Sequence, residues 1–168
     1  PVSHMERQEG VAFVAVGLGK TVADGKKSLR FSPYYPEILS QYYSPGTMLE
    51  NSQNNFYALD LNDGANPMIE GEVNNLSLYN LSKAEEDGEL KYIASVLDTN
   101  DSVLRDSLQY SGPRVITFSG LLKHRRIELA EILKFFLEYG ESALGCPIEI
   151  EFAVNLNDEG IDEFALLQ

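Results

Sequence analysis

Apolar and polar residues alternate in several short stretches of the chain, which is the pattern of strands that bury one face. Turn-forming Gly, Pro, Asn and Asp residues bound these stretches, as expected where strands begin and end. We therefore predict strands at residues 11–16, 29–31, 56–61, 76–81, 92–96 and 114–118.

The segments between these strands show no clear period. Residues 34–53 are rich in Tyr, Ser, Pro and Gly, so we predict irregular structure there, with a short helical turn near residues 36–41. A closing loop is predicted at residues 62–67 and an acidic turn at residues 85–88. Residues 103–108 are predicted to form one or two helical turns.

One long helix is predicted over residues 127–144. Its polar residues recur at three- and four-residue spacing, at Glu128, Glu131, Lys134 and Glu138. Leu129, Ile132, Leu133, Phe136 and Leu137 are among the apolar residues that fill the remaining positions. Because the polar stripe is narrow, we expect the helix to pack against a sheet. Gly145 is expected to cap the helix, and Pro147 prevents its continuation.

A hairpin with two carboxylates is predicted at the end of the chain. Glu149 and Glu151 leave one face of its first strand, whereas Ile148, Ile150 and Phe152 leave the other. Two carboxylates on one strand face repel each other unless a cation lies between them. Since Mg²⁺ is usually bound by one or two carboxylates plus substrate phosphates, a magnesium nucleotide is a candidate ligand. The same pattern is also typical of a half-buried strand with a solvated face, which is the commoner case.

The hairpin sequence resembles a known family. Residues 147–153, followed after a polar turn by Leu166-Leu167-Gln168, are similar to the end of the nucleotide-binding domain of phosphoenolpyruvate synthases and pyruvate phosphate dikinases. That family typically reads Pro-x-Asp-Ile-Glu-Trp-Ala and then Leu-x-x-Leu-Gln-x-Arg, on adjoining strands of an ATP-grasp fold. Glu149 stands at the family's Asp, Glu151 at its Glu and Gln168 at its Gln. The resemblance implies that Glu149 and Glu151 hold Mg²⁺ and that Glu151 and Gln168 contact ATP.

A glycine-containing segment near the start supports the same resemblance. Residues 9–25 are similar to the family's apolar strand that leads into Gly-Leu-Gly, a Val and another Gly, although Lys20 stands where the family often has Glu. The resemblance implies nucleotide contacts for Gly17, Gly19 and Lys20. Alternatively, the two glycines serve only a tight turn between strand and loop, and Lys20 is a solvated lysine.

Commoner phosphate-binding motifs are excluded in this segment. A Walker A loop requires Gly where Val14 stands, and the dinucleotide-binding fingerprint requires Gly where Val22 stands.

The two histidines offer little chemistry. His4 lacks the Gly-Gly-x-Thr-Ser-His-Ala context of the family's phosphorylated histidine, and His124 lies among basic residues that are typical of a solvated loop or of a phosphate contact. No catalytic residue is assigned.

Composition narrows the function further. The chain has 168 residues, 43% of them hydrophobic, and these suit one domain with a core. Its formal net charge of −13 disfavours nucleic-acid and membrane-surface binding. No apolar run reaches the length of a membrane helix. The single Cys146 cannot form an internal disulfide, and we expect a buried thiol in a cytoplasmic protein.

These observations predict an α+β fold, with a mainly antiparallel sheet packed against helices. By resemblance, residues 1–168 are part of an ATP-grasp domain from a larger multidomain enzyme, a pyruvate, water dikinase-like kinase. Its ligand is Mg-ATP, and its partners are the first half of the ATP-grasp domain, a phosphohistidine domain and a phosphoenolpyruvate/pyruvate domain. The chain ends at Gln168, before the family's Arg, and it lacks the first half of the domain, so we expect no ATP turnover by this chain alone.

Two alternatives to the dikinase interpretation stay open. One is an ATP-grasp phosphotransferase with another acceptor, since such enzymes share these nucleotide motifs. The other is a non-catalytic interaction module. The longer side chain of Glu149 favours the second alternative, because one extra methylene displaces a carboxylate from the position that an octahedral Mg²⁺ site requires.

Overall fold

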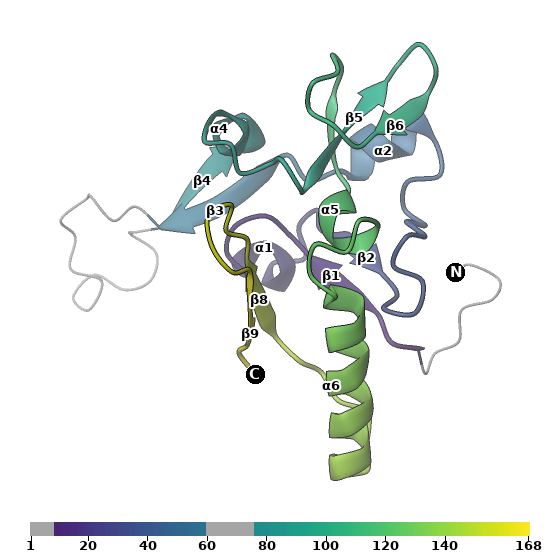
Figure 1. The fold of residues 1–168 in the computed structure, drawn as a ribbon, viewed down its shortest axis with the longest axis vertical. Coiled ribbons are helices and arrows are strands. Elements are labelled where there is room, and N and C mark those ends of the chain that lie inside the picture. The colour runs from purple at the N-terminus through teal and green to yellow at the C-terminus, as the bar shows by residue number, and fades with distance from the viewer. Residues whose placement is uncertain (1–8, 60–75) are drawn as a thin grey trace.

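The computed structural model describes residues 9–59 and 76–168, which form nine strands and five helices (Figure 1). The strands are β1 (Ala12–Val14), β2 (Leu29–Phe31), β3 (Asn55–Leu59), β4 (Leu76–Asn80), β5 (Ala94–Asp98), β6 (Val103–Arg105), β7 (Arg114–Ile116), β8 (Phe152–Asn155) and β9 (Glu163–Leu166). The helices are α1 (Lys20–Ala23), α2 (Pro45–Asn51), α4 (Leu81–Glu86), α5 (Ser119–Leu122) and α6 (Leu129–Leu144).

Every strand pairing among the described residues is antiparallel. The strands form three two-stranded sheets, β1-β2, β3-β4 and β8-β9, and one three-stranded sheet in the order β6-β5-β7. Small antiparallel sheets with separate helices confirm the predicted α+β class.

The core gathers around β5, which lies between β6 and β7. Ala94, Val96 and Leu97 of β5 are almost completely buried, because this strand is covered on both faces. The surrounding core residues include Leu29 and Phe31 of β2, Val115 and Ile116 of β7, Leu121 and Leu122 of α5, and Leu129 and Leu133 of α6. The apolar strands and the start of the long helix therefore build one core.

The predicted strands are present: β1, β4 and β7 are shorter than predicted, β2 has the predicted bounds, and β5 is shifted by two residues. Residues 60 and 61 of the strand predicted at 56–61 lie outside the described residues. Three predictions between the strands are wrong. Residues 36–41 contain turns but no helix, and the helix of the 34–53 segment is α2. Ser44 and Thr47 form its capping box, and Pro45 occupies its first position, where the missing N–H costs nothing. Residues 85 and 86 belong to α4, which Asn80 caps. The loop predicted at residues 62–67 lies outside the described residues.

The third wrong prediction concerns residues 103–108. Val103–Arg105 form β6, which pairs with β5 so that Val103 lies opposite Asp98. The intervening turn includes Ser102 with a positive φ of 56°. The Arg105 guanidinium lies 3.0 Å from the Asp98 carboxylate and holds the hairpin closed. The residues predicted to be helical thus begin with the second strand of a hairpin, because pairing with β5 holds Val103–Arg105 extended.

Helix α6 ends as predicted, with Gly145 in the left-handed conformation at φ 69°. Its apolar side is buried only in part: Leu129 and Leu133 are 1% exposed, whereas Phe135 is 60% and Tyr139 66% exposed. Cys146 is exposed, so the predicted buried thiol is wrong. The helix extends away from the core toward its C-terminal end, and the cysteine follows at that end (Figure 1).

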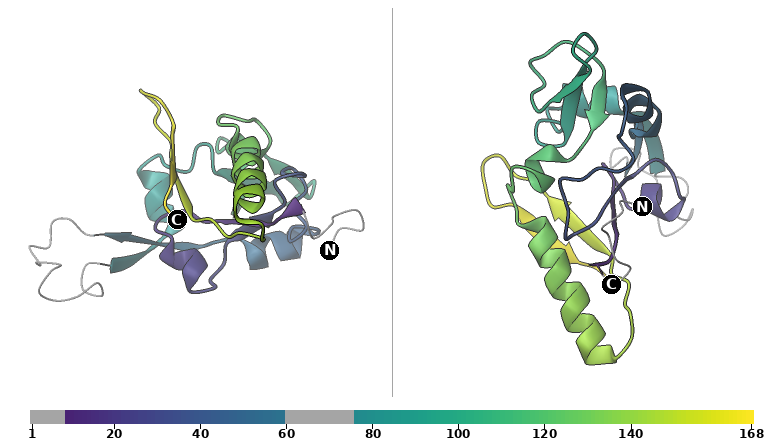
Figure 2. Two further views of the ribbon diagram at one scale, coloured as in Figure 1. Left: turned by 90° about the horizontal axis from the view of Figure 1, so that it is seen from below. Right: turned by 90° about the vertical axis from the view of Figure 1, so that its right-hand side faces the viewer.

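The β8-β9 hairpin lies beside α6 (Figure 2). Phe164 of β9 stacks on Phe136 of α6, with ring centroids 5.8 Å apart, and on Phe152 of β8 at 5.6 Å. Phe152, Val154 and Phe164 are half-buried against the core. One face of the hairpin is therefore attached to the helix by aromatic contacts.

A buried glutamine joins β1 to β3. The side chain of Gln53, which is 5% exposed, accepts from the Val16 N–H at 2.8 Å and donates to the Val16 carbonyl at 2.9 Å. It also donates to the Asn55 carbonyl at 2.9 Å. The Gln53 amide thus takes the place of a neighbouring strand for the Val16 backbone, directly before Gly17.

We expect Gln53→Met to lower the free energy of unfolding by about 1–3 kcal/mol, because it leaves the Val16 N–H and carbonyl without their partners. Urea unfolding monitored by circular dichroism measures the change. Gln109→Met on an exposed loop is the control and should change stability by less than about 0.5 kcal/mol. Equal effects of the two substitutions would show that the Gln53 amide does not connect the strands.

Candidate functional site

The open end of the β8-β9 hairpin brings two of the predicted site residues together. The Glu151 N–H donates to the Gln168 carbonyl at 2.8 Å. The Leu167 and Gln168 N–H groups donate to the Glu151 carbonyl at 2.8 and 3.3 Å. The ladder thus continues beyond β8 and β9, and backbone pairing fixes Glu151 against Gln168.

The predicted alternation of exposure is confirmed, but the predicted placement of Glu149 and Glu151 within the first strand is wrong, because β8 begins only at Phe152. Glu149 and Glu151 are exposed, whereas Ile148, Ile150 and Phe152 are half-buried. Ile148 packs against Gly140 of α6, where an added Cβ would lie 2.2 Å from the Ile148 Cδ1 atom. The apolar residues therefore hold this segment against the molecule and leave both carboxylates on the outside.

The carboxylates of Glu149 and Glu151 are too few to form a metal site by themselves. Within residues 9–59 and 76–168, neither Glu149 nor Glu151 has a cationic partner, and no group of three or more His, Cys, Asp or Glu side chains is arranged to hold a metal. One or two carboxylates with phosphate oxygens and water complete the coordination of Mg²⁺. The donor set is too small for a site made by the protein alone.

The glycine segment makes its close contacts with β3. Gly17 has φ 86°, and an added Cβ would lie 2.6 Å from the Tyr57 carbonyl oxygen. The neighbouring Leu18 N–H donates to the same carbonyl at 3.0 Å. Gly17 is therefore required by a close backbone approach. Gly19, in contrast, has open space where a Cβ would be.

Lys20 lies on the surface beside this turn. Its ammonium nitrogen is 3.3 Å from the Asp24 carboxylate and 5.8 Å from the centroid of the Tyr57 ring. The predicted site residues thus fall into two groups: Glu149, Glu151 and Gln168 at the end of the hairpin, and Gly17, Gly19 and Lys20 beside β3.

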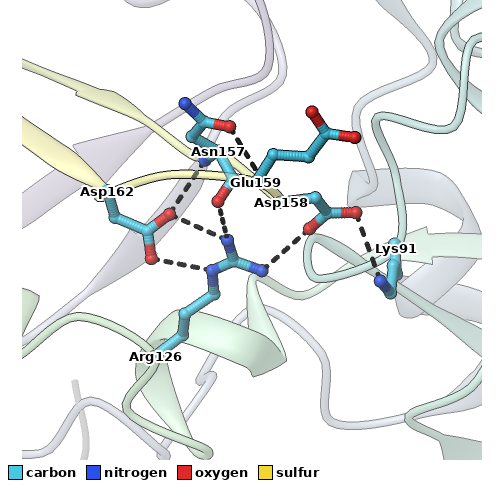
Figure 3. A network of polar contacts seen from close by, with 6 residues as sticks. All are labelled: Lys91, Arg126, Asn157, Asp158, Glu159 and Asp162. Carbon is cyan, nitrogen blue, oxygen red and sulfur yellow. Dashed lines mark hydrogen bonds and ion pairs between the residues drawn. The ribbon is translucent and has the colours of Figure 1, made fainter.

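A network around Arg126 holds the turn of the hairpin in place (Figure 3). Arg126 donates to both carboxylate oxygens of Asp162, at 2.7 and 2.8 Å. It also donates to Asp158 at 3.2 Å and to the Asn157 carbonyl at 2.8 Å. Lys91 binds the second oxygen of Asp158 at 3.2 Å. We call Arg126, Lys91, Asn157, Asp158 and Asp162 the hairpin clamp.

The hairpin clamp lowers the pKa values of its two aspartates, Asp158 and Asp162. The hydrogen bonds from Arg126, with one from the Asn157 N–H, lower the pKa of Asp162 to about 2. Lys91 and Arg126 lower the pKa of Asp158. The Arg126 guanidinium also lies 3.9 Å from the centroid of the Tyr92 ring. Because Asp162 binds one edge of the Arg126 guanidinium and the Tyr92 ring lies against it, the guanidinium has little freedom to move.

The sequence did not reveal this clamp. Its local signals are a basic run, Lys123-His124-Arg125-Arg126, and a polar turn at residues 155–160, which are separated along the chain.

His124 belongs to another network: its Nε2 lies 3.2 Å from Asp106, which also binds Lys123 at 2.7 Å. The buried Ser95 hydroxyl donates to the same carboxylate at 2.8 Å.

Comparison with protein-family models, with curated proteins and with solved structures gives no significant match. Among the described residues, no helix is long and apolar enough to span a membrane.

We expect the clamp to contribute stability that is lost in acid. A carboxylate with a lowered folded-state pKa stabilises the fold above its unfolded pKa, and this contribution disappears as the pH falls from about 5 toward 2. Asp162→Asn should therefore be less stable than the native chain near neutral pH, and the difference should vanish near pH 2. Urea unfolding at a series of pH values measures it.

Glu159→Gln provides the control in the same turn, because its exposed carboxylate lies outside the clamp. It should not alter the pH dependence of stability. A constant difference between Asp162→Asn and the native chain across the whole pH range would contradict the assigned role of the carboxylate.

Proposed function

We propose that the open end of the β8-β9 hairpin binds Mg-ATP, as part of the ATP-grasp nucleotide-binding domain of a phosphoenolpyruvate synthase-like dikinase. The observation that carries the proposal is the backbone pairing of Glu151 with Gln168, two residues after the exposed Glu149. Backbone pairing brings Gln168 opposite Glu151, and within the described residues neither Glu149 nor Glu151 has a cationic partner.

Each residue of this site has a definite role in the proposal. Glu149 and Glu151 hold Mg²⁺, and Gln168 donates or accepts a hydrogen bond at the nucleotide. Gly17, Gly19 and Lys20 contact phosphates. Bound Mg²⁺ would neutralise charge on the phosphate oxygens, which is the main requirement of phosphoryl transfer together with positioning.

The parent protein in this proposal is a cytoplasmic kinase of the pyruvate, water dikinase type. The nucleotide domain would deliver a phosphoryl group to a histidine on another domain, and a further domain would bind pyruvate. The chemistry at the hairpin is the same if the final acceptor is another small molecule, because the acceptor does not touch these residues.

A non-catalytic interaction module is the second candidate. It is favoured by the exposed aromatic pair of α6, in which Phe135 and Tyr139 stack with centroids 5.8 Å apart while both are more than half exposed. Large exposed apolar groups that lie together often mark a surface that contacts another protein. In this alternative Glu149 and Glu151 are simply the solvated face of a strand.

Titration of the chain with Mg-ATP, followed by nuclear magnetic resonance, distinguishes the two candidates. We expect the backbone amide signals of Glu149, Glu151 and Gln168 to shift on addition of Mg-ATP and to shift much less when EDTA removes the metal. Glu151→Gln should abolish the shifts, because it removes a metal ligand and a negative charge.

Glu163→Gln is the matched control, since Glu163 is exposed at the other end of the hairpin, opposite Asn155. It removes the same charge and should leave the Mg-ATP shifts intact. If folded protein shows no shift with Mg-ATP, or if the two variants respond alike, the hairpin is not the nucleotide site.

A further inference from the structure

The segment from α1 to β2 has a net positive charge, although the chain as a whole is acidic. The whole sequence has 26 acidic and 13 basic residues. Residues 20–30 contain four of these basic residues, Lys20, Lys26, Lys27 and Arg30, and a single acid, Asp24. All four are exposed. We call these four residues the basic patch.

Most of the basic patch has no acidic partner. Asp24 pairs with Lys20 at 3.3 Å. Within the described part of the chain, Lys26, Lys27 and Arg30 make no ion pair with a carboxylate. In a chain with twice as many acids as bases, cations that stay unpaired on one surface create a local positive potential that attracts anions.

Two ammonium groups of the patch converge on one aromatic ring. Lys26 lies 4.3 Å and Lys20 5.8 Å from the centroid of the Tyr57 ring. The two nitrogens are therefore no more than about 10 Å apart. Lys26 also forms a hydrogen bond with the Tyr57 hydroxyl. Because the hydroxyl is neutral, it orients the ammonium group without cancelling its charge.

The backbone of Tyr57 is held by its neighbours. Tyr57 lies in the middle of β3, opposite Leu78 of β4. Its carbonyl accepts from Leu18, and Gly17 packs closely against the same oxygen. The strand thus fixes the backbone that carries the Tyr57 ring, and its carbonyl fixes the glycine turn that precedes Lys20.

We infer that Lys20 and Lys26, arranged around Tyr57, bind the phosphate chain of a polyphosphate ligand. A linear polyphosphate carries several negative charges along one axis, so it can contact two ammonium groups at once, and a lysine binds phosphate as a point charge. This inference rests on the proposed function for the identity of the nucleotide, and it adds Lys26 and Tyr57 to the phosphate-contacting residues. The patch itself suits free or nucleotide-borne polyphosphate equally.

The test is calorimetric titration of the chain with inorganic triphosphate and separately with Mg-ATP. Lys26→Gln should weaken triphosphate binding by about tenfold, and Lys26→Arg should retain most of the affinity because it keeps the charge. Lys83→Gln makes the same change of net charge on α4, where Lys83 pairs with Asp87, and should have little effect. Added salt should weaken the binding of the native chain.

The two proposals fail separately in this experiment. Triphosphate and Mg-ATP binding that both depend on Lys26 but not on Glu151 support the basic patch and remove the hairpin site. Mg-ATP binding that depends on Glu151 and is unchanged in Lys26→Gln overturns the basic patch alone. An equal loss of triphosphate affinity in Lys26→Gln and Lys83→Gln, or no triphosphate binding at all, also overturns it.

Discussion

The position of the C-terminal hairpin depends on the guanidinium group of Arg126. A two-stranded sheet is marginally stable by itself, and within residues 9–59 and 76–168 β8 and β9 pair only with each other. Arg126 connects the turn of the hairpin to the loop before α6, and its contact with Tyr92 connects both to the segment that leads into β5. Because the planar guanidinium of Arg126 donates two parallel hydrogen bonds to the Asp162 carboxylate, this ion pair fixes the orientation of the two groups as well as their distance.

The aromatic stack completes this attachment and sets which side chains face outward. Phe152 and Phe164 can meet Phe136 only if one face of the hairpin turns toward α6. Because side chains alternate along a strand, a slip by one residue would expose the phenylalanines and bury the glutamates. The outward placement of Glu149 and Glu151 is thus a consequence of packing on the opposite face. It would be the same with or without a ligand.

Periodicity predicted those parts of the molecule in which neighbours along the chain decide the structure. The alternation of residues 148–152, the helix that ends at Gly145 and the strands of the core follow this logic. The α2 helix was missed although its capping signal, Ser44 with Thr47, is local. The hairpin clamp could not be predicted, because no period relates Arg126 to Asp162 and only the tertiary fold brings them together. Exposure of Cys146 likewise depends on how far the helix extends beyond the core.

An acidic chain that binds a polyanion must overcome the electrostatic repulsion between its own negative charges and the ligand. With a net charge of −13, the long-range potential repels phosphate, so any affinity has to come from short-range contacts. The two candidate surfaces meet this requirement in different ways. At the hairpin, the carboxylates of Glu149 and Glu151 attract a divalent cation, and the cation then accepts phosphate oxygens. At the basic patch, Lys26 contacts the anion directly, and Tyr57 keeps its ammonium group oriented while leaving its charge intact. Binding at the first surface should therefore require metal, whereas binding at the second should weaken with salt and need none.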